Sequence, residues 1–353
     1  MNVRTATILI CTYNRSGLLR ETLAALQLMT PPADCAVDVV VVDNNSTDDT
    51  ATVVAAFAEA PRFPVRYCRE RQQGKSFALN HGLAHSHGDV IALTDDDVLP
   101  AEDWIARVVG AFRDHDVTFA FGKVLPRWSV TPPPELLTER AQHIWGPLAL
   151  LDYGDAVAHY YPDSRGLGLP IGANLSLSRA ALVTIGGWRT DLGKVNNSLI
   201  SGEDHEIFMR LRRHDLYRGV YDPENVVRHY VPASRLTREY FRRWFYWSGK
   251  TRALMLQDLY PELDIDRVLK LAGTPRFLYR QGFEQAWHYL RTLGRNDALG
   301  VFIEELKVIQ YTGLYVECWR RRHRSFAAAA QESAARLGHS GLTSRRDEVS
   351  AYD

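Results

Sequence analysis

The first hundred residues alternate between two hydrophobic periods, and this alternation restricts the fold more than any other feature of the chain. Continuous apolar runs, typical of strands buried on both faces, cover residues 7–12, 37–42 and 90–94. Apolar residues recur at helical spacing over 15–28, and a further helix is expected over 74–85. Regular alternation of strand and helix predicts right-handed βαβ units on a mostly parallel sheet, so the expected fold class is α/β.

Composition narrows the class of protein. The chain has 353 residues, of which 46% are hydrophobic and 24% charged, as expected for a globular protein with a sizeable core. This excludes a wholly disordered chain, a collagen-like chain and a small disulfide scaffold. Lys and Arg number 42, and Asp and Glu also number 42, so the net charge indicates no polyanionic partner.

The cysteines favour a reducing compartment. They are Cys11, Cys35, Cys68 and Cys318, with no C-x-x-C pair and no nearby histidine at zinc-ligand spacing. The sequence therefore argues against a structural zinc site, and reduced thiols in the cytoplasm fit best. Because the chain has no secretory h-region and no run of about 18 apolar residues, we expect a cytoplasmic protein without a transmembrane helix.

Changes in composition and hydrophobic pattern along the chain predict three regions. Residues 1–230 form the expected α/β domain. Residues 231–325 form a helical region rich in aromatic and basic residues, with 17 Lys or Arg against 10 Asp or Glu over 235–324. The last stretch, 326–353, has four alanines followed by Ser, Gly and mixed charges, and is expected to be disordered because it has little to bury.

Three consecutive acids, Asp95, Asp96 and Asp97, follow the apolar run at 90–94. In open α/β sheets, ligands bind beyond the carboxyl ends of the strands. Since side chains alternate along an extended segment, Asp95 and Asp97 can converge while Asp96 points elsewhere. Adjacent carboxylates repel unless a cation lies among them, and their oxygens suit Mg²⁺ or Mn²⁺. The alternative is a solvated acidic turn that caps the next helix.

Two other strand ends bring polar residues to the same edge. These residues are Thr12, Tyr13, Asn14 and Arg15 after the first strand, and Asp43 to Ser46 after the second. An aspartate there can bind a base or ribose, whereas Asn14 and Ser46 serve equally well as helix N-caps. Gly74-Lys75-Ser76 opens a helix but lacks the Walker frame, although Lys75 at a helix start could still face a diphosphate.

Taken in order, these motifs resemble family 2 glycosyltransferases of the GT-A fold. The resemblance covers about residues 5–230, and its motifs are Thr12-Tyr13-Asn14-Arg15, Val41 to Asp48, Gly74-Lys75 with Asn80, Asp95-Asp96-Asp97, Gly172-Ala173-Asn174, Gly186-Gly187-Trp188 and Gly202-Glu203-Asp204. It implies a Rossmann-like sheet flanked by helices and followed by a C-terminal helical region. It also implies inverting, metal-dependent transfer of one sugar from a nucleotide-diphosphate sugar, with a UDP-sugar favoured and GDP- or dTDP-sugars as alternatives.

The resemblance also assigns roles to residues. Donor binding is expected from Thr12, Tyr13, Asn14, Arg15, Asp43, Gly74, Lys75, Asp95 and Asp96. Within that set, Asp43 would contact the nucleobase and Asp95 the ribose. Asp97 would bind Mn²⁺ or Mg²⁺ together with His229, although a lone histidine is more often structural.

The general base and the acceptor side follow from the same resemblance. Asp204 would take the proton of the acceptor hydroxyl. For Glu203 and Asp204, stabilisation of a helix dipole in a first turn is the alternative. The acceptor-side candidates are Gly172, Asn174, Trp188 and Glu203, with core packing nearly as good an account of Trp188.

The basic segment Phe241-Arg242-Arg243-Trp244-Phe245-Tyr246-Trp247 interleaves cations with aromatics. Peripheral membrane contact through 235–325, with a glycan or lipid-linked acceptor, is the leading interpretation. Packing on the catalytic domain comes close behind it, and no nucleic-acid partner is expected. Tyr240 stands where processive synthases of this family carry glutamine, which favours transfer of a single sugar. The rival functions are a sugar-phosphate nucleotidyltransferase and a non-catalytic nucleotide-sugar-binding protein.

Overall fold

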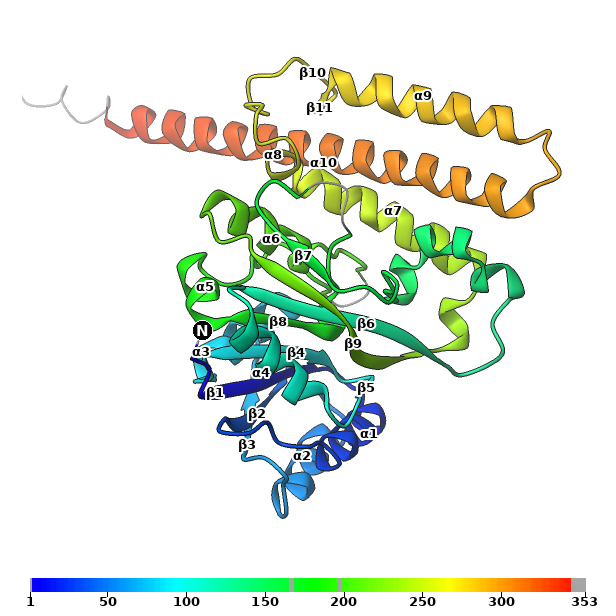
Figure 1. Cartoon of the computed structure of the whole chain (residues 1–353). Helices are drawn as coiled ribbons and strands as arrows, with labels where there is room; N and C mark the ends of the chain where they lie inside the picture. Colours follow the sequence, from blue (N-terminus) through cyan, green and yellow to red (C-terminus); the bar gives the residue numbers. More distant parts are fainter. Residues whose placement is uncertain (1, 165–167, 196–197, 344–353) are drawn as a thin grey trace, which may run out of the picture.

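The computed structural model describes the backbone of residues 2–164, 168–195 and 198–343, and the side chains of these residues as far as His323. A twisted central sheet is flanked by helices, and a layer of long helices lies along one side of it (Figure 1). The α/β class and the C-terminal helical region that the sequence predicts are both confirmed.

The sheet is mostly parallel at its N-terminal half and mixed beyond it. Its strands are β1 (Thr5–Thr12), β2 (Ala36–Asp43), β3 (Val65–Arg69), β4 (Val90–Asp95), β5 (Val98–Pro100), β6 (Phe119–Trp128), β7 (Ala158–Tyr160), β8 (Leu175–Ser178) and β9 (Gly219–Val231). They run in the order β3-β2-β1-β4-β8-β6-β9-β5, and β7 pairs with β9. Strands β3, β2, β1 and β4 are parallel to one another, whereas β8 is antiparallel to β4 and to β6.

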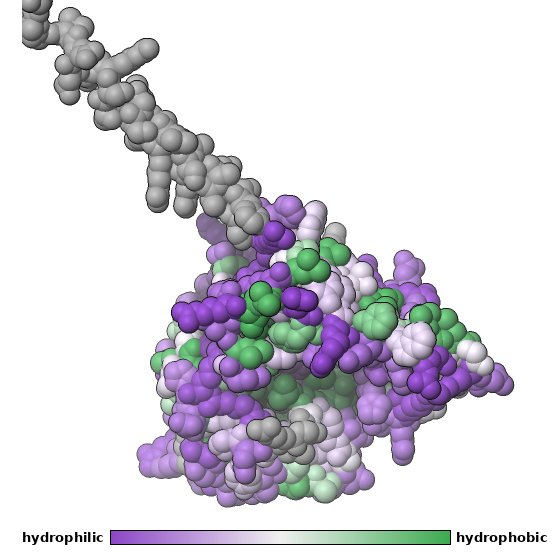
Figure 2. All heavy atoms as spheres, turned by 90° about the horizontal axis from the view of Figure 1, so that it is seen from above, coloured by the Kyte–Doolittle hydropathy of each residue, from purple (hydrophilic) through white to green (hydrophobic). Residues whose placement is uncertain are grey.

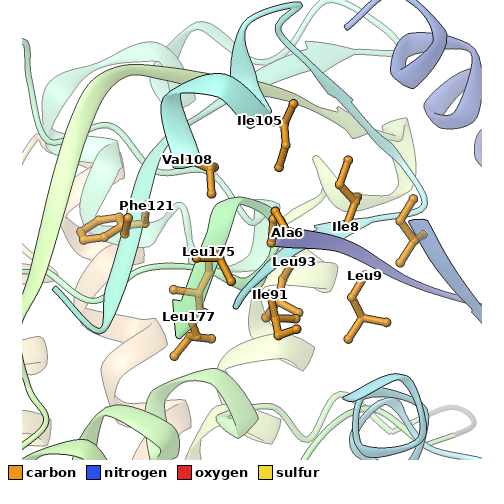
Figure 3. Close-up of a cluster of buried hydrophobic side chains, with 14 of the residues drawn as sticks. Ala6, Ile8, Leu9, Ile91, Leu93, Ile105, Val108, Phe121, Leu175 and Leu177 are labelled. Carbon is orange, nitrogen blue, oxygen red and sulfur yellow. The ribbon is translucent and has the colours of Figure 1, made fainter. Parts of the chain in front are cut away.

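Helices cover both faces of the sheet, because successive strand residues point to opposite faces and are apolar on each. The helices of this part are α1 (Ser16–Gln27), α2 (Thr50–Ala58), α3 (Lys75–His85), α4 (Trp104–Asp114), α5 (Arg179–Thr184) and α6 (Glu203–Arg213), with 3₁₀ turns η1 (Pro134–Leu137), η2 (Glu139–Ile144), η3 (Gly146–Leu148) and η4 (Gly172–Asn174). Ile8 and Leu9 project from opposite faces of β1, with Ile8 on the side of Ile105 and Val108 of α4 (Figure 3). Both are at most 1% exposed, as expected for a strand buried on both faces.

The C-terminal layer comprises η5 (Ala233–Arg235), α7 (Arg238–Leu254), α8 (Leu256–Leu259), the hairpin β10 (Lys270–Leu271) and β11 (Thr274–Pro275), α9 (Arg276–Thr292) and α10 (Ala298–Thr343). Helices α7 and α10 touch through glycines. A Cβ on Gly249 would lie 1.8 Å from the Gln310 carbonyl oxygen, and one on Gly313 would lie 1.9 Å from that of Tyr246. Only glycine permits this backbone approach.

β9 ends at Val231, and the regions before and after the predicted boundary at residue 230 share a core. Leu136 and Ile144, from the 3₁₀ turns before β7, pack with Phe241 of α7 and Leu306 of α10. The helical layer is therefore joined to the sheet domain by apolar packing as well as by the chain.

The predicted disordered tail differs from the structure over 326–343, because α10 continues to Thr343. Four consecutive alanines at 327–330 have the highest helix propensity of any residue, which favours continuation of the helix. Residues 344–353 of the predicted tail lie outside the described residues. Within the described part of the chain, no helix combines the length and the apolar character needed to cross a bilayer.

Candidate active site

The three polar strand ends that the sequence singled out lie side by side. Thr12 of β1 is in register with Asp43 of β2, and Cys11 of β1 is in register with Asp95 of β4. Because these strands are parallel, their carboxyl ends meet at one edge of the sheet.

The loops after β1 and β2 hold each other in place. Asn14 N–H donates to Ser46 Oγ at 2.9 Å, and the Asn14 side-chain oxygen accepts from Thr47 N–H at 2.7 Å. Asn14 has φ of 51°, a left-handed conformation that asparagine tolerates better than most residues. Neither Asn14 nor Ser46 caps a helix, since the N-cap positions of α1 and α2 are Arg15 and Asp49.

Asp43 is buried at the end of β2. Its carboxylate accepts hydrogen bonds from Tyr67 Oη at 2.6 Å and from Ser46 N–H at 2.7 Å. Burial and the adjacent Asp43 raise the pKa of Tyr67 to about 12. Tyr67 and Tyr13 are 38% and 42% exposed, and such faces can stack on a nucleobase. Sequence reasoning missed Tyr67, which lies within a strand and carries no motif signal.

Asp96 is buried and lies beside Asp97, which differs from the expected convergence of Asp95 with Asp97. Its two oxygens accept from Thr12 Oγ1 at 2.8 Å and from Arg15 Nη1 at 3.0 Å. The same Arg15 nitrogen lies 2.8 Å from Asp97 Oδ2, so one guanidinium offsets the repulsion between two acids. Burial raises the pKa of Asp96 to about 6, although Arg15 opposes this shift.

Asp97 and His229 are brought together by an antiparallel strand pair. Val98 of β5 is opposite His229 of β9, and Tyr230 N–H donates to the Asp97 carbonyl oxygen at 2.9 Å. His229 Nε2 consequently lies 3.4 Å from Asp97 Oδ1. Burial lowers the pKa of His229 to about 4, so its imidazole is neutral near pH 7. The structure therefore pairs the two residues that the sequence proposed as metal ligands.

Lys75 lies between carboxylates of two different elements. Its Nζ is 3.4 Å from Asp95 Oδ1 and 3.6 Å from Glu203 Oε1. Burial would raise the pKa of Asp95, but Lys75 and His229 outweigh it and lower that pKa to about 2. For Glu203, burial and the adjacent Asp204 raise the pKa. In this structure Lys75, at the start of α3 after Gly74, balances the charge of buried acids.

Asp204 faces the same small cavity as Asp95, Lys75 and Gly172. Gly202, with φ of 95°, turns the chain into α6 and places Glu203 and Asp204 in its first turn. This position is compatible with the helix-dipole role as well as with a role in the site.

The side chains of two acceptor-side candidates are engaged in hydrogen bonds or core packing away from the cavity. The Asn174 amide accepts from Trp104 Nε1 at 2.8 Å and donates to the Lys123 and Asn225 carbonyl oxygens at 3.0 and 2.9 Å. Trp188 is only 2% exposed and belongs to the main core. For these residues the structure corrects the expectation of an acceptor contact, because their side chains are used in packing.

A basic cavity of about 780 Å³ adjoins the aspartates. Among the described residues, its lining includes the cations Arg15, Lys194, Arg235 and Arg243 and one acid, Glu239. Arg15 also contacts Asp96 and Asp97, so the cavity opens beside the proposed metal ligands. Arg235 Nη1 lies 3.5 Å from His229 Nε2, which connects η5 to the same place. Such a cavity suits an anionic group of the size of a diphosphate.

The donor set fits a divalent cation. Asp97 Oδ1 is buried and has no hydrogen-bond partner among the described residues. It faces the neutral imidazole of His229, and an oxygen with a nitrogen donor suits Mn²⁺, while carboxylate oxygen also suits Mg²⁺.

Comparison with known proteins agrees with this geometry. Residues 7–165 match the family model described as Glycosyl transferase family 2. The chain carries a domain of this family over residues 7–165. Its fold is shared with the mannosyltransferase PcManGT of Pyrobaculum calidifontis, at a TM-score of 0.51 and 20% identity over 98% of this chain and 82% of that one.

Curated relatives of this glycosyltransferase act on different substrates. A glucosyl-dolichyl phosphate glucuronosyltransferase of Haloferax volcanii is 24% identical over 74% of this chain and 80% of its own length. An undecaprenyl-phosphate 4-deoxy-4-formamido-L-arabinose transferase of Sodalis glossinidius is 33% identical over 33% of this chain and 36% of its own length. The chain thus spans only about a third of the second relative.

Proposed function

We propose that this glycosyltransferase moves one sugar, with inversion, from a nucleotide-diphosphate sugar to a hydroxyl of a glycan or lipid-linked acceptor. The observation that carries the proposal is the buried pair of Asp97 Oδ1 and His229 Nε2, 3.4 Å apart beside a cavity lined by four cations. PcManGT is described in complex with GDP-Man and Mn²⁺, which supports a nucleotide-sugar donor and a divalent metal. The names of the two curated relatives contain dolichyl phosphate and undecaprenyl phosphate, which favours a lipid-linked acceptor.

The donor would lie across the carboxyl edge of β1, β2 and β4. The base would stack near Tyr13 and Tyr67 above Asp43, and Asp95 would bind the ribose. Arg15, already shared between two aspartates, and Arg235 would face the diphosphate. Guanidinium groups suit this task because they form charge-assisted hydrogen bonds with phosphate oxygens.

Asp97 and His229 would hold Mn²⁺ or Mg²⁺, which when bound neutralises charge on a leaving diphosphate without any proton transfer. Burial keeps His229 neutral, so its nitrogen can serve as a ligand near pH 7.

Asp204 would accept the proton of the acceptor hydroxyl. Its Oδ1 is buried and has no hydrogen-bond partner among the described residues, so one lone pair is available. Sugar transfer passes through an oxocarbenium-like state, and removing the hydroxyl proton strengthens the attacking oxygen. Neighbouring Glu203 also has a buried oxygen, Oε2, with no hydrogen-bond partner among the described residues, while Lys75 lies 3.6 Å from its Oε1.

For a lipid-linked acceptor, the protein would contact the cytoplasmic face of a membrane peripherally, and α9 is the proposed contact surface. Phe283, Trp287 and Leu290 are 72%, 57% and 55% exposed, and their spacing places them on one face of the helix. Over 276–295 the chain carries four Arg and one Glu. An aromatic and apolar face flanked by arginines suits an anionic lipid surface. Figure 2 looks onto this layer and shows hydrophobic residues among hydrophilic ones.

The segment that the sequence favoured for this contact is used differently. Phe241 and Phe245 of α7 are buried against α10, and Arg242 pairs with Glu305 at 2.6 Å. Packing therefore accounts for this aromatic and basic motif, and α9 replaces it as the proposed surface.

A thermal-shift panel tests the proposed donor class. UDP-, GDP- and dTDP-sugars are each added with and without Mn²⁺, and the free nucleoside diphosphates serve as comparison. A donor at about 100 times its Kd should stabilise the fold by about 2.7 kcal/mol. Donors that stabilise the protein are then tested for release of nucleoside diphosphate with polyprenyl phosphate or glycan acceptors. If none of the nucleotides stabilises the protein, the proposal is contradicted.

A further inference from the structure

Three side chains that commonly bind metals converge at the outer edge of the sheet, away from the Asp97 pair. They are Cys68 on the edge strand β3 and His81 and His85, one turn apart on α3. One ligand atom from each lies within 4.8 Å of the other two. We propose that Cys68, His81 and His85 form a second metal site, with Zn²⁺ as the ion that a thiolate and two imidazoles fit best.

The hydrogen bonds of the two imidazoles prepare them for this role. His81 Nδ1 lies 2.9 Å from Glu70 Oε2, and His85 Nδ1 lies 2.9 Å from the carbonyl oxygen of His81. Since an ionised carboxylate and a carbonyl can only accept, each Nδ1 donates in these contacts, which leaves Nε2 as the nitrogen available to a metal. Carboxylate and carbonyl partners of this kind orient histidine ligands in zinc sites.

Cys68 supplies the third donor. Its side chain is 8% exposed and forms no disulfide. Burial raises the pKa of the thiol while Arg66 lowers it, so metal binding would have to displace a proton. The imidazole rings are stacked with centroids 4.6 Å apart. Zinc bonds of about 2.0–2.3 Å require donors about 3.3–3.6 Å apart, so small side-chain rotations would close the site.

The location suggests what such an ion would do. It would join the edge strand β3 to α3, next to Tyr67, which donates to Asp43 in the proposed base pocket. Three protein ligands leave one position for water, as in zinc sites that are not purely structural. Sequence analysis missed this group because the first cysteine of a Cys2His2 zinc motif is absent, although Cys68, His81 and His85 have the spacing C-x12-H-x3-H of its remaining part.

Titration of the full chain with Co²⁺ tests the site directly. A cobalt–thiolate bond gives a charge-transfer absorption, which oxygen and nitrogen ligands such as Asp97 and His229 cannot produce. We expect this band to saturate at one equivalent of Co²⁺ per chain and to disappear when Zn²⁺ is added. The Glu70→Gln variant should weaken Co²⁺ binding by about 10- to 100-fold, because it removes the carboxylate behind His81.

Matched cysteine variants identify the thiol. Cys68→Ser should lose the band, whereas Cys35→Ser should retain it, with circular dichroism confirming that both variants are folded. His81→Ala serves as a second test if Cys68→Ser fails to fold. A wild-type protein without the band, or a band that persists in Cys68→Ser or is unaffected by His81→Ala, would overturn the proposal. None of these outcomes depends on the glycosyltransferase activity.

Discussion

Asp204 is tied to the backbone of Gly172, whose N–H donates to Asp204 Oδ2 at 3.0 Å. A Cβ at position 172 would lie 2.7 Å from that oxygen, so a side chain there would displace the carboxylate. The hydrogen bond uses Oδ2 and leaves Oδ1 with no partner among the described residues. The fixed orientation and the free oxygen are what a general base requires.

Asp204→Asn should abolish most of the transfer while preserving the fold. The amide oxygen can still accept from Gly172 but cannot take a proton, so kcat should fall by about 10²- to 10⁴-fold. Donor affinity, measured by calorimetry, should change little. The exposed carboxylate of Asp155 offers a control, and Asp155→Asn should keep wild-type kcat. A kcat for Asp204→Asn close to that of the wild type would remove Asp204 from the mechanism.

Gly249→Ala should destabilise the chain, because the added Cβ would meet the Gln310 carbonyl oxygen at 1.8 Å. Overpacking of this kind costs about 1–3 kcal/mol. Gly110, within α4, is the matched helical control, since its Cβ would meet only Asp114 Oδ2 at 3.9 Å. Gly110→Ala should therefore stabilise the chain by up to about 1 kcal/mol. Urea unfolding of both variants checks this, and equal effects would contradict the close α7–α10 approach.

Asp89 should make a pH-dependent contribution to stability. Partial burial raises its pKa, but hydrogen bonds from Arg4 and Thr5 N–H, at 2.9 and 3.1 Å, lower it below the ordinary value of 3.8. The ionised form is thus favoured in the folded state. Its contribution should be fully present above about pH 4 and lost as the pH falls through the folded-state pKa.

The size of this contribution is small because Asp89 is exposed, well under about 1 kcal/mol. The free energies of unfolding of wild type and Asp89→Asn should therefore differ more at about pH 6 than at about pH 2.5. If the difference in the free energy of unfolding grows as the pH falls, the prediction is wrong.

Trp287→Ser on α9 should weaken binding to anionic vesicles. The residue is 57% exposed, so the substitution removes an apolar anchor without opening a core cavity. Flotation with phosphatidylglycerol vesicles measures the bound fraction, which should fall at least about threefold. Val183, 56% exposed on α5, provides the control, and Val183→Ser should bind like the wild type. If neither variant changes binding, or if wild type forms dimers through α9 instead, the membrane assignment is wrong.

Most of the fold could be predicted because local pattern and tertiary environment agree there. The continuous apolar runs of β1, β2 and β4 require burial on both faces, and only a sheet covered on both sides provides it. Two features of the fold could not be predicted from the sequence. The full length of strand β9, Gly219–Val231, does not follow from the local pattern, because Pro223 and the charges around it resemble a turn. The helix beyond residue 326 escaped because its composition gives little to bury.

The candidate site could be predicted where strand ends carry it. Asp95 and Asp97 follow directly from position, since a parallel strand places its carboxyl end at the sheet edge. Tyr67 could not be predicted in this way, because its role depends on a hydrogen bond to Asp43 across neighbouring strands. Asn174 was assigned to the acceptor side on resemblance, while its amide is used by Trp104 and two backbone carbonyls.

The central claim is that Asp97 and His229 hold the cation that a nucleotide-sugar donor requires. Calorimetric titration of UDP, GDP and dTDP, each with and without Mn²⁺, tests it most directly when wild type is compared with Asp97→Asn and His229→Gln. We predict that at least one of these nucleotides binds wild type about tenfold or more tightly with Mn²⁺, and that each substitution removes most of this gain. An Mn²⁺ effect that is absent in wild type, or unchanged in both variants, would contradict the account.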